Sequence, residues 1–199
     1  MAKDQPELPT LAFADAAEWE SWLASQPLSA NGLWVKFAKK ASGVPTVSKP
    51  DAIDAALCHG WIDGQLKPFD ENYWLIRFTP RRPKSKWSAV NCKRVEALIV
   101  AGRMRPAGLV EIERAKADGR WEVAYQSQST ITVPADLQQA LDGNESAKFL
   151  FNTLDSANRY AVLYRVHTAT KPETRERMIE RLVAMLARGE TIHPRRGKP

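Results

Sequence analysis

The chain has 199 residues, of which 44% are hydrophobic and 26% charged, and its formal net charge is +6. This length is enough to bury a core but too short for a large multi-domain enzyme. No window reaches the roughly 18 consecutive apolar residues of a membrane span. The opening residues, MAKDQPELPTLAF, lack the basic head and apolar run of a secretory signal. We therefore expect a cytoplasmic protein.

Two helices are predicted in the N-terminal part. Asp15 and Glu18 form a capping box that opens the first helix. Ser48 and Asp51 open the second in the same way, and Gly60 stands where a helix-ending glycine is expected. Each helix has apolar residues spaced by three and four, which predicts that one face of it is buried.

Strands are predicted between and after these helices. Residues 33–40 alternate between apolar and polar positions, and residues 11–13 could add an edge strand. Residues 61–66 and 73–80, joined by the turn 67–72, predict a hairpin. Because a hairpin is antiparallel, we expect an α+β fold in which helices cover a small, mostly antiparallel sheet.

The C-terminal half predicts helices almost throughout. The first begins near Trp87 and ends at Gly102, and the last is opened by a capping box of Thr170 and Glu173. The helices between Gly102 and Thr170 are predicted at 106–119, 134–143, 145–154 and 156–168.

This pattern divides the chain into regions. Residues 1–86 form the sheet region, residues 87–192 form a helical region packed on it as one compact unit, and residues 193–199 form a disordered tail.

The positive charge is concentrated in one window. Residues 72–95 contain seven basic side chains and no acid, so the rest of the chain sums to −1. Such a patch can attract phosphates, nucleic acid or anionic head groups. Alternatively, it is a solvated surface whose cations pair with Asp63, Asp70 or Glu71.

The window contains a candidate anion site. Pro80 and Pro83 stiffen the loop that holds Arg81 and Arg82, and a guanidinium binds phosphate or carboxylate through two parallel hydrogen bonds. A helix N-terminus capped by Ser85 or Ser88 would add backbone N–H donors. The residues expected to bind the ligand are Trp61, Asp63, Arg77, Arg81, Arg82, Ser85, Trp87, Ser88 and Asn91.

Two of these residue types also have alternative roles. Asp63 could act as a general base, but an acid facing several arginines should have a lowered pKa, so we expect it to hold Arg77 or Arg81 in place. Trp61, Trp74 and Trp87 could stack on a ligand, although we expect such rings to pack in the core.

Motifs for other chemistry are absent from the sequence. Cys58 and Cys92 form no CxxC pair, and the three histidines show no ligand spacing, so we expect no metal site. No GxSxG, HExxH, GxxxxGK[ST] or GxGxxG motif occurs, so we expect no bound cofactor and can assign no catalytic residue.

Three stretches resemble one known family. They are GLWVKFAKKASGVPTVSKPDAIDAALCHGWIDGQ, RFTPRRPKSKWSAVNCKRVEALIVAGRMRPAGLVEIERAKADGRW and SANRYAVLYRVHTATKPETRERMIERLVAMLARGETIHP. Together they are similar, over residues 10–194, to the YdeI/OmpD-associated (OmdA) or bacteriocin-protection proteins. The resemblance implies a bacterial role in resistance to bacteriocins or antimicrobial peptides and, by name, a link to an outer-membrane porin. It carries no catalytic residues.

Three functional hypotheses follow. The first is a non-catalytic stress-protection protein that binds an anionic small molecule or protein partner at the Arg81/Arg82 loop. The second is an enzyme acting on a small phosphorylated or carboxylated metabolite, with Asp63 as acid/base. The third is nucleic-acid binding by residues 73–94, which the acids of the last helix disfavour.

Overall fold

The computed structural model describes residues 7–27 and 29–194. Within these residues the chain forms two compact units, one of residues up to Ser85 together with Asn91–Trp121, and the other of Lys86–Val90 together with the residues from Glu122 onward. The predicted boundary after residue 86 therefore falls within residues 86–90, the short segment that belongs to the second unit between two stretches of the first. The packing of a helical region on a sheet region stays a prediction, and the predicted tail lies, from residue 195, outside the described residues.

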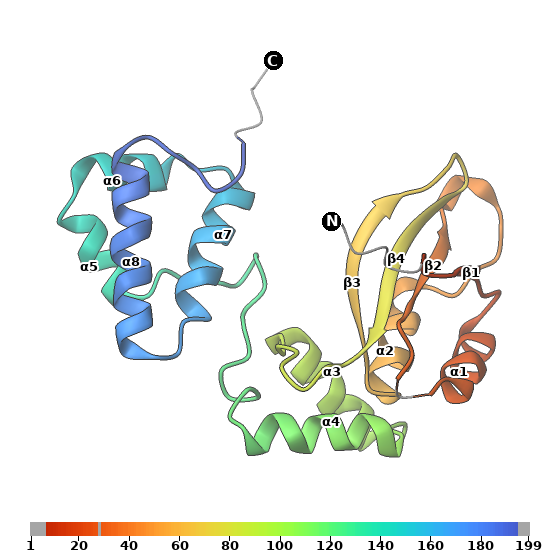
Figure 1. The fold of residues 1–199 in the computed structure, drawn as a ribbon. Helices are drawn as coiled ribbons and strands as arrows, with labels where there is room; N and C mark the ends of the chain where they lie inside the picture. The colour runs from red at the N-terminus through yellow and green to blue at the C-terminus, as the bar shows by residue number, and fades with distance from the viewer. Residues whose placement is uncertain (1–6, 28, 195–199) are drawn as a thin grey trace. The chain divides into compact units, whose positions relative to one another are not determined.

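The first unit is a four-stranded sheet with helices, and its strand order is β1-β2-β4-β3 (Figure 1). β1 pairs with β2 in parallel, whereas the β2–β4 and β3–β4 pairs are antiparallel. The elements are β1 (Thr10–Ala12), α1 (Ala16–Ser25), β2 (Leu33–Ala38), a 3-10 turn (Lys40–Ser42), α2 (Lys49–Cys58), β3 (Trp61–Pro68), β4 (Tyr73–Pro80), α3 (Ala89–Val100) and α4 (Pro106–Ala117). The expected α+β class, the hairpin and the edge strand are confirmed.

The core of this unit lies on the sheet face that carries Phe78. Trp19 of α1 is fully buried, contacts the Phe78 ring edge-on, and donates its indole N–H to the carbonyl of Ala52 in α2 at 3.0 Å. The helix starts are those expected, because Asp15 accepts from the backbone N–H of Glu18 and Ser48 accepts from that of Asp51. Local caps therefore fix where the two helices begin, and one long-range hydrogen bond joins α1 to α2.

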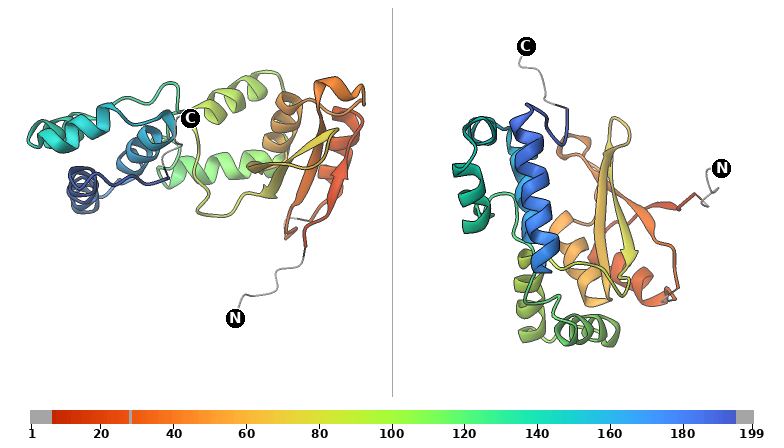
Figure 2. Two further views of the ribbon diagram at one scale, coloured as in Figure 1. Left: turned by 90° about the horizontal axis from the view of Figure 1, so that it is seen from above. Right: turned by 60° about the vertical axis from the view of Figure 1, so that its left-hand side comes forward.

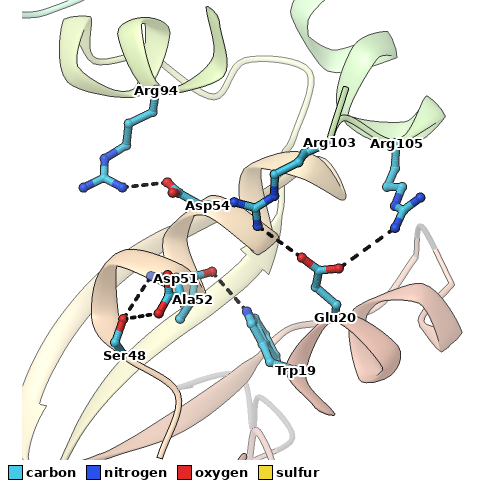
Figure 3. A network of polar contacts seen from close by, with 9 residues as sticks. All are labelled: Trp19, Glu20, Ser48, Asp51, Ala52, Asp54, Arg94, Arg103 and Arg105. Carbon is cyan, nitrogen blue, oxygen red and sulfur yellow. Dashed lines mark hydrogen bonds and ion pairs between the residues drawn. The ribbon is translucent and has the colours of Figure 1, made fainter. Parts of the chain in front are cut away.

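Ion pairs link the helices of the first unit at its surface. Glu20 of α1 approaches Arg103 at 3.3 Å and Arg105 at 4.0 Å, and Asp54 of α2 pairs with Arg94 of α3 at 2.6 Å (Figure 3). Such contacts fix the relative orientation of helices more than they add stability, because exposed pairs contribute little net free energy.

The second unit is helical. Its helices are α5 (Ala135–Asp142), α6 (Glu145–Asn152), α7 (Ser156–His167) and α8 (Pro172–Ala187). The first two residues of α3, Ala89 and Val90, also belong to this unit. α8 contacts α5, α6 and α7 and lies centrally among them (Figure 1). The core includes Leu137, Phe151, Leu163 and Leu182. No helix among the described residues is long and apolar enough to cross a bilayer.

The predicted capping box of the last helix is wrong. Lys171, not Thr170, occupies the N-cap position of α8, and its side chain makes no capping hydrogen bond. The reason is Pro172, which stands in the first turn and forces the preceding residue into an extended conformation. Within the first turns of α8, the guanidinium of Arg177 donates to the backbone carbonyl of Glu173 at 3.2 Å.

Candidate functional site

The β3–β4 hairpin positions two of the predicted site residues, Asp63 and Arg77. Asp63 is paired with Phe78, so it shares the sheet face of that residue, whereas Arg77 precedes Phe78 and is paired with Trp34. Because side chains alternate along a strand, Asp63 and Arg77 lie on opposite faces. Asp63 therefore does not face Arg77, and the other expected partner of Asp63, Arg81, stays a prediction.

Arg81 and Arg82 have different environments although they are adjacent. The backbone N–H of Arg81 donates to the carbonyl of Gly60 at 2.9 Å, and the residue is only 7% exposed. Arg82 is exposed to solvent. The pair is therefore not a symmetrical clamp, and a ligand in solvent meets Arg82 first.

A tight turn presents Arg82. The N–H of Ser85 donates to the carbonyl of Arg82 at 2.8 Å, and the hydroxyl of Ser85 accepts from the N–H of Arg82 at 2.9 Å. Pro83 sits at the second position of this turn, where its fixed φ is favoured. We call residues 80–85 the basic loop.

The helix that follows starts later than predicted. α3 begins at Ala89 rather than near Trp87, and the hydroxyl of Ser85 belongs to the turn rather than to a helix cap. The cause is a pairing with Tyr125: its N–H donates to the carbonyl of Trp87 at 3.0 Å, and its carbonyl accepts from Ala89 at 2.9 Å. This pairing keeps residues 87 and 88 extended.

The predicted site residues are divided between the two units. Trp87 and Ser88 belong to the second unit, and Trp61, Asp63, Arg77, Arg81, Arg82, Ser85 and Asn91 belong to the first. The clustering of the full set stays a prediction. The basic loop, residues 80–85, belongs entirely to the first unit.

Two of the three candidate tryptophans are packing residues, as expected. Trp61 is 3% exposed, and its ring contacts that of Trp22 edge-on with centroids 5.6 Å apart. Trp87 is 2% exposed. Trp74 is half-buried and therefore differs from both.

Arg120 is a residue at the basic loop that the sequence did not reveal. Its guanidinium donates to the backbone carbonyl of Ser85 at 2.6 Å and to both carboxylate oxygens of Asp118 at 2.8 Å. The hydrogen bond from Arg120 lowers the pKa of the Asp118 carboxyl below its usual value. No local signal could have shown this contact, because Arg120 and Ser85 are 35 positions apart.

The charges of the basic window are compensated unevenly. Arg94 pairs with Asp54, and the ammonium of Lys86 lies 4.9 Å from the centre of the Tyr164 ring. Among residues 7–27 and 29–194, Arg82 and Lys84 form no ion pair with an acid, and both are exposed. The alternative interpretation, in which the loop's cations pair with neighbouring acids, therefore does not hold for these two residues.

The groups that the basic loop exposes are suited to binding an anion. In the described part of the chain no three His, Cys, Asp or Glu residues are grouped closely enough to hold a metal ion. Cys58 is buried, and burial raises the pKa of its thiol, which disfavours the nucleophilic thiolate. Guanidinium and ammonium groups on a braced turn can hold an anion by charge and hydrogen bonds.

Two family models match the chain. Residues 11–111 match the model described as Domain of unknown function (DUF8412), and residues 130–189 match the model described as Bacteriocin-protection, YdeI or OmpD-Associated (OmdA). The resemblance to the OmdA family is confirmed for this C-terminal part, whereas most of the central stretch, residues 60–119, falls within the other match. No curated protein and no solved structure matches the chain.

Proposed function

We propose that this chain, which belongs to the family described as Domain of unknown function (DUF8412), is a non-catalytic stress-protection protein of the bacterial cytoplasm that holds an anionic ligand or partner at the basic loop. The OmdA match of residues 130–189 supports the protective role through its printed description. In this proposal protection is indirect, through capture of an anion inside the cell.

The observation that carries the proposal is the uncompensated charge of Arg82 and Lys84 on a turn of fixed geometry. Two hydrogen bonds between Arg82 and Ser85 close the turn, and Arg120 braces it from outside. A loop that is already ordered loses little conformational entropy when it binds, so more of the electrostatic attraction appears as affinity. The same cations on a loose loop would bind more weakly.

The proposal is tested by removing the two charges together. Because the side chains of Arg82 and Lys84 are exposed and form no ion pair among the described residues, Arg82→Gln/Lys84→Gln should fold like the parent, as circular dichroism can verify. Lys171→Gln/Arg181→Gln, at the N-cap of α8 and within α8, removes the same charge from exposed side chains and is the matched control. Binding of inorganic phosphate, citrate and a single-stranded oligonucleotide is measured for each variant.

The expected result has a binding part and a cellular part. The loop variant loses phosphate or citrate binding and fails to restore the resistance of a deletion strain to a bacteriocin. The control variant keeps the binding and restores the resistance. Fractionation should find the protein in the cytoplasm. The proposal is wrong if the loop variant binds and protects like the parent, or if the oligonucleotide binds with a steep salt dependence and the small anions do not.

A further inference from the structure

A second acid-free stretch lies outside the basic window. Residues 21–50 contain no Asp or Glu and four lysines, Lys36, Lys39, Lys40 and Lys49. The stretch covers β2, the loop after it and the start of α2. Three of its lysines line a pocket that is separate from the basic loop.

The pocket lies in the first unit at the end of β2. It has a volume of about 310 Å³, and it is lined by residues 37–40, residues 43–49 and Trp74. The rings of Phe37 and Trp74 are stacked in it, with centroids 4.8 Å apart and an angle of 26° between the planes. Its volume is at the lower end of the range of small-molecule sites.

Hydrogen bonds hold the pocket wall in place. The N–H of Lys39 donates to the carbonyl of Asn72 at 2.7 Å, and its ammonium donates to the carbonyl of Asp70 at 2.8 Å. Thr46 accepts from the N–H of Ala38 at 3.0 Å through its hydroxyl. The loop after β2 is thus fastened to the tip of the β3–β4 hairpin, beside which it runs in Figures 1 and 2.

The charge of the pocket is positive. Lys39, Lys40 and Lys49 line it, and no carboxylate does. The nearest acid along the chain, Asp51, accepts the hydroxyl hydrogen bond of Ser48 at 2.6 Å (Figure 3). Within the described residues Lys40 and Lys49 form no ion pair.

We propose that this pocket binds a small anion carrying a flat ring, the chemistry of a nucleoside monophosphate. The ammonium groups of Lys40 and Lys49 hold the phosphate, and the ring packs against the partly exposed Trp74. Stacking on an aromatic side chain tolerates any base, so the site accepts purine and pyrimidine nucleotides alike. This binding is independent of the function proposed for the basic loop.

The test is calorimetric titration of the full chain with AMP, GMP and UMP, together with adenosine and inorganic phosphate. We expect tighter binding of the nucleotides than of adenosine or phosphate. In Lys40→Gln/Lys49→Gln the affinity for AMP should fall about tenfold, because each exposed ion pair contributes a factor of about two to five. Lys171→Gln/Arg181→Gln should bind like the parent.

Two further variants separate the parts of the inference. Trp74→Leu should lower the affinity for AMP to that for phosphate, and unchanged AMP binding in this variant would overturn the ring contact. Arg82→Gln/Lys84→Gln should keep AMP binding. If instead Arg82→Gln/Lys84→Gln loses AMP binding and Lys40→Gln/Lys49→Gln keeps it, the nucleotide is not bound in the pocket. The function proposed for the basic loop would then still stand. Absence of binding by all three nucleotides also overturns the inference.

Discussion

Gly108→Ala should destabilise the first unit, because Gly108 allows α4 to approach the end of α2. A Cβ atom at this position would collide with the carbonyl oxygen of Cys58 and would lie 2.7 Å from the carbonyl oxygen of Leu57 and from Cε of Met104. Two of these neighbours are backbone atoms of a buried helix end, so they cannot rotate away. The helices must therefore separate.

The size of the effect follows from two opposing terms. Overpacking of this kind costs about 1–3 kcal/mol, and the better helix propensity of alanine returns up to about 1 kcal/mol. We expect a net loss of about 1–2 kcal/mol. The displaced turn also carries the basic loop, because the carbonyl of Gly60 accepts from Arg81, and a Cβ at Gly60 would lie 3.0 Å from the carbonyl oxygen of Ala107 in α4.

Urea unfolding followed by tryptophan fluorescence measures this loss, since six of the seven tryptophans lie in the first unit. Gly64→Ala in β3 of the same unit is the control: Gly64 has no positive φ, and its Cβ would lie at a normal 3.6 Å from the carbonyl oxygen of Arg77. We expect a change within about 0.5 kcal/mol for the control. The reasoning is refuted if Gly108→Ala is as stable as the parent.

Three other predictions concern single contacts. Arg175→Ala removes two hydrogen bonds to Asp136, one of them at 3.0 Å, and should cost the second unit about 1–2 kcal/mol in thermal unfolding; no change would contradict it. Trp19→Phe removes the buried hydrogen bond to Ala52 and part of the core, and it should lower the free energy of urea unfolding by about 2–3 kcal/mol. An almost unchanged free energy of unfolding would show that the indole N–H is dispensable. Burial lowers the pKa of His59, so the unfolded chain binds the proton more readily, and the contribution of His59 to stability should be complete above its ordinary pKa of about 6.5 and lost as the pH falls through the lowered value. Stability of His59→Gln should depend less on pH between about 7.5 and 5 than that of the parent, and an equal dependence would refute the assignment.

Local signals determined most of the predictions that are confirmed. The helix caps at Asp15 and Ser48 involve residues three apart, and the hairpin of β3 and β4 follows from alternation on either side of a turn. The error at Thr170 arose because two local signals competed, and the constraint of Pro172 on its neighbour outweighed the capping box.

Long-range contacts account for what the sequence could not show. The start of α3 depends on Tyr125, and the brace of the basic loop depends on Arg120. Register alone separates Asp63 from Arg77, although both belong to the hairpin that leads into the loop. The lysines of the pocket lie in an acid-free stretch that was not predicted as a site, and the closure of the pocket by Trp74 depends on the fold.

The most direct test of the proposed function is a titration of the isotope-labelled chain with inorganic phosphate at constant ionic strength, followed by the backbone amide signals. We predict saturable shifts of the amides of Arg82, Lys84 and Ser85, which disappear in Arg82→Gln/Lys84→Gln and persist in Lys171→Gln/Arg181→Gln. Shifts that leave the basic loop unaffected, or that are the same in both variants, would contradict anion binding at this loop.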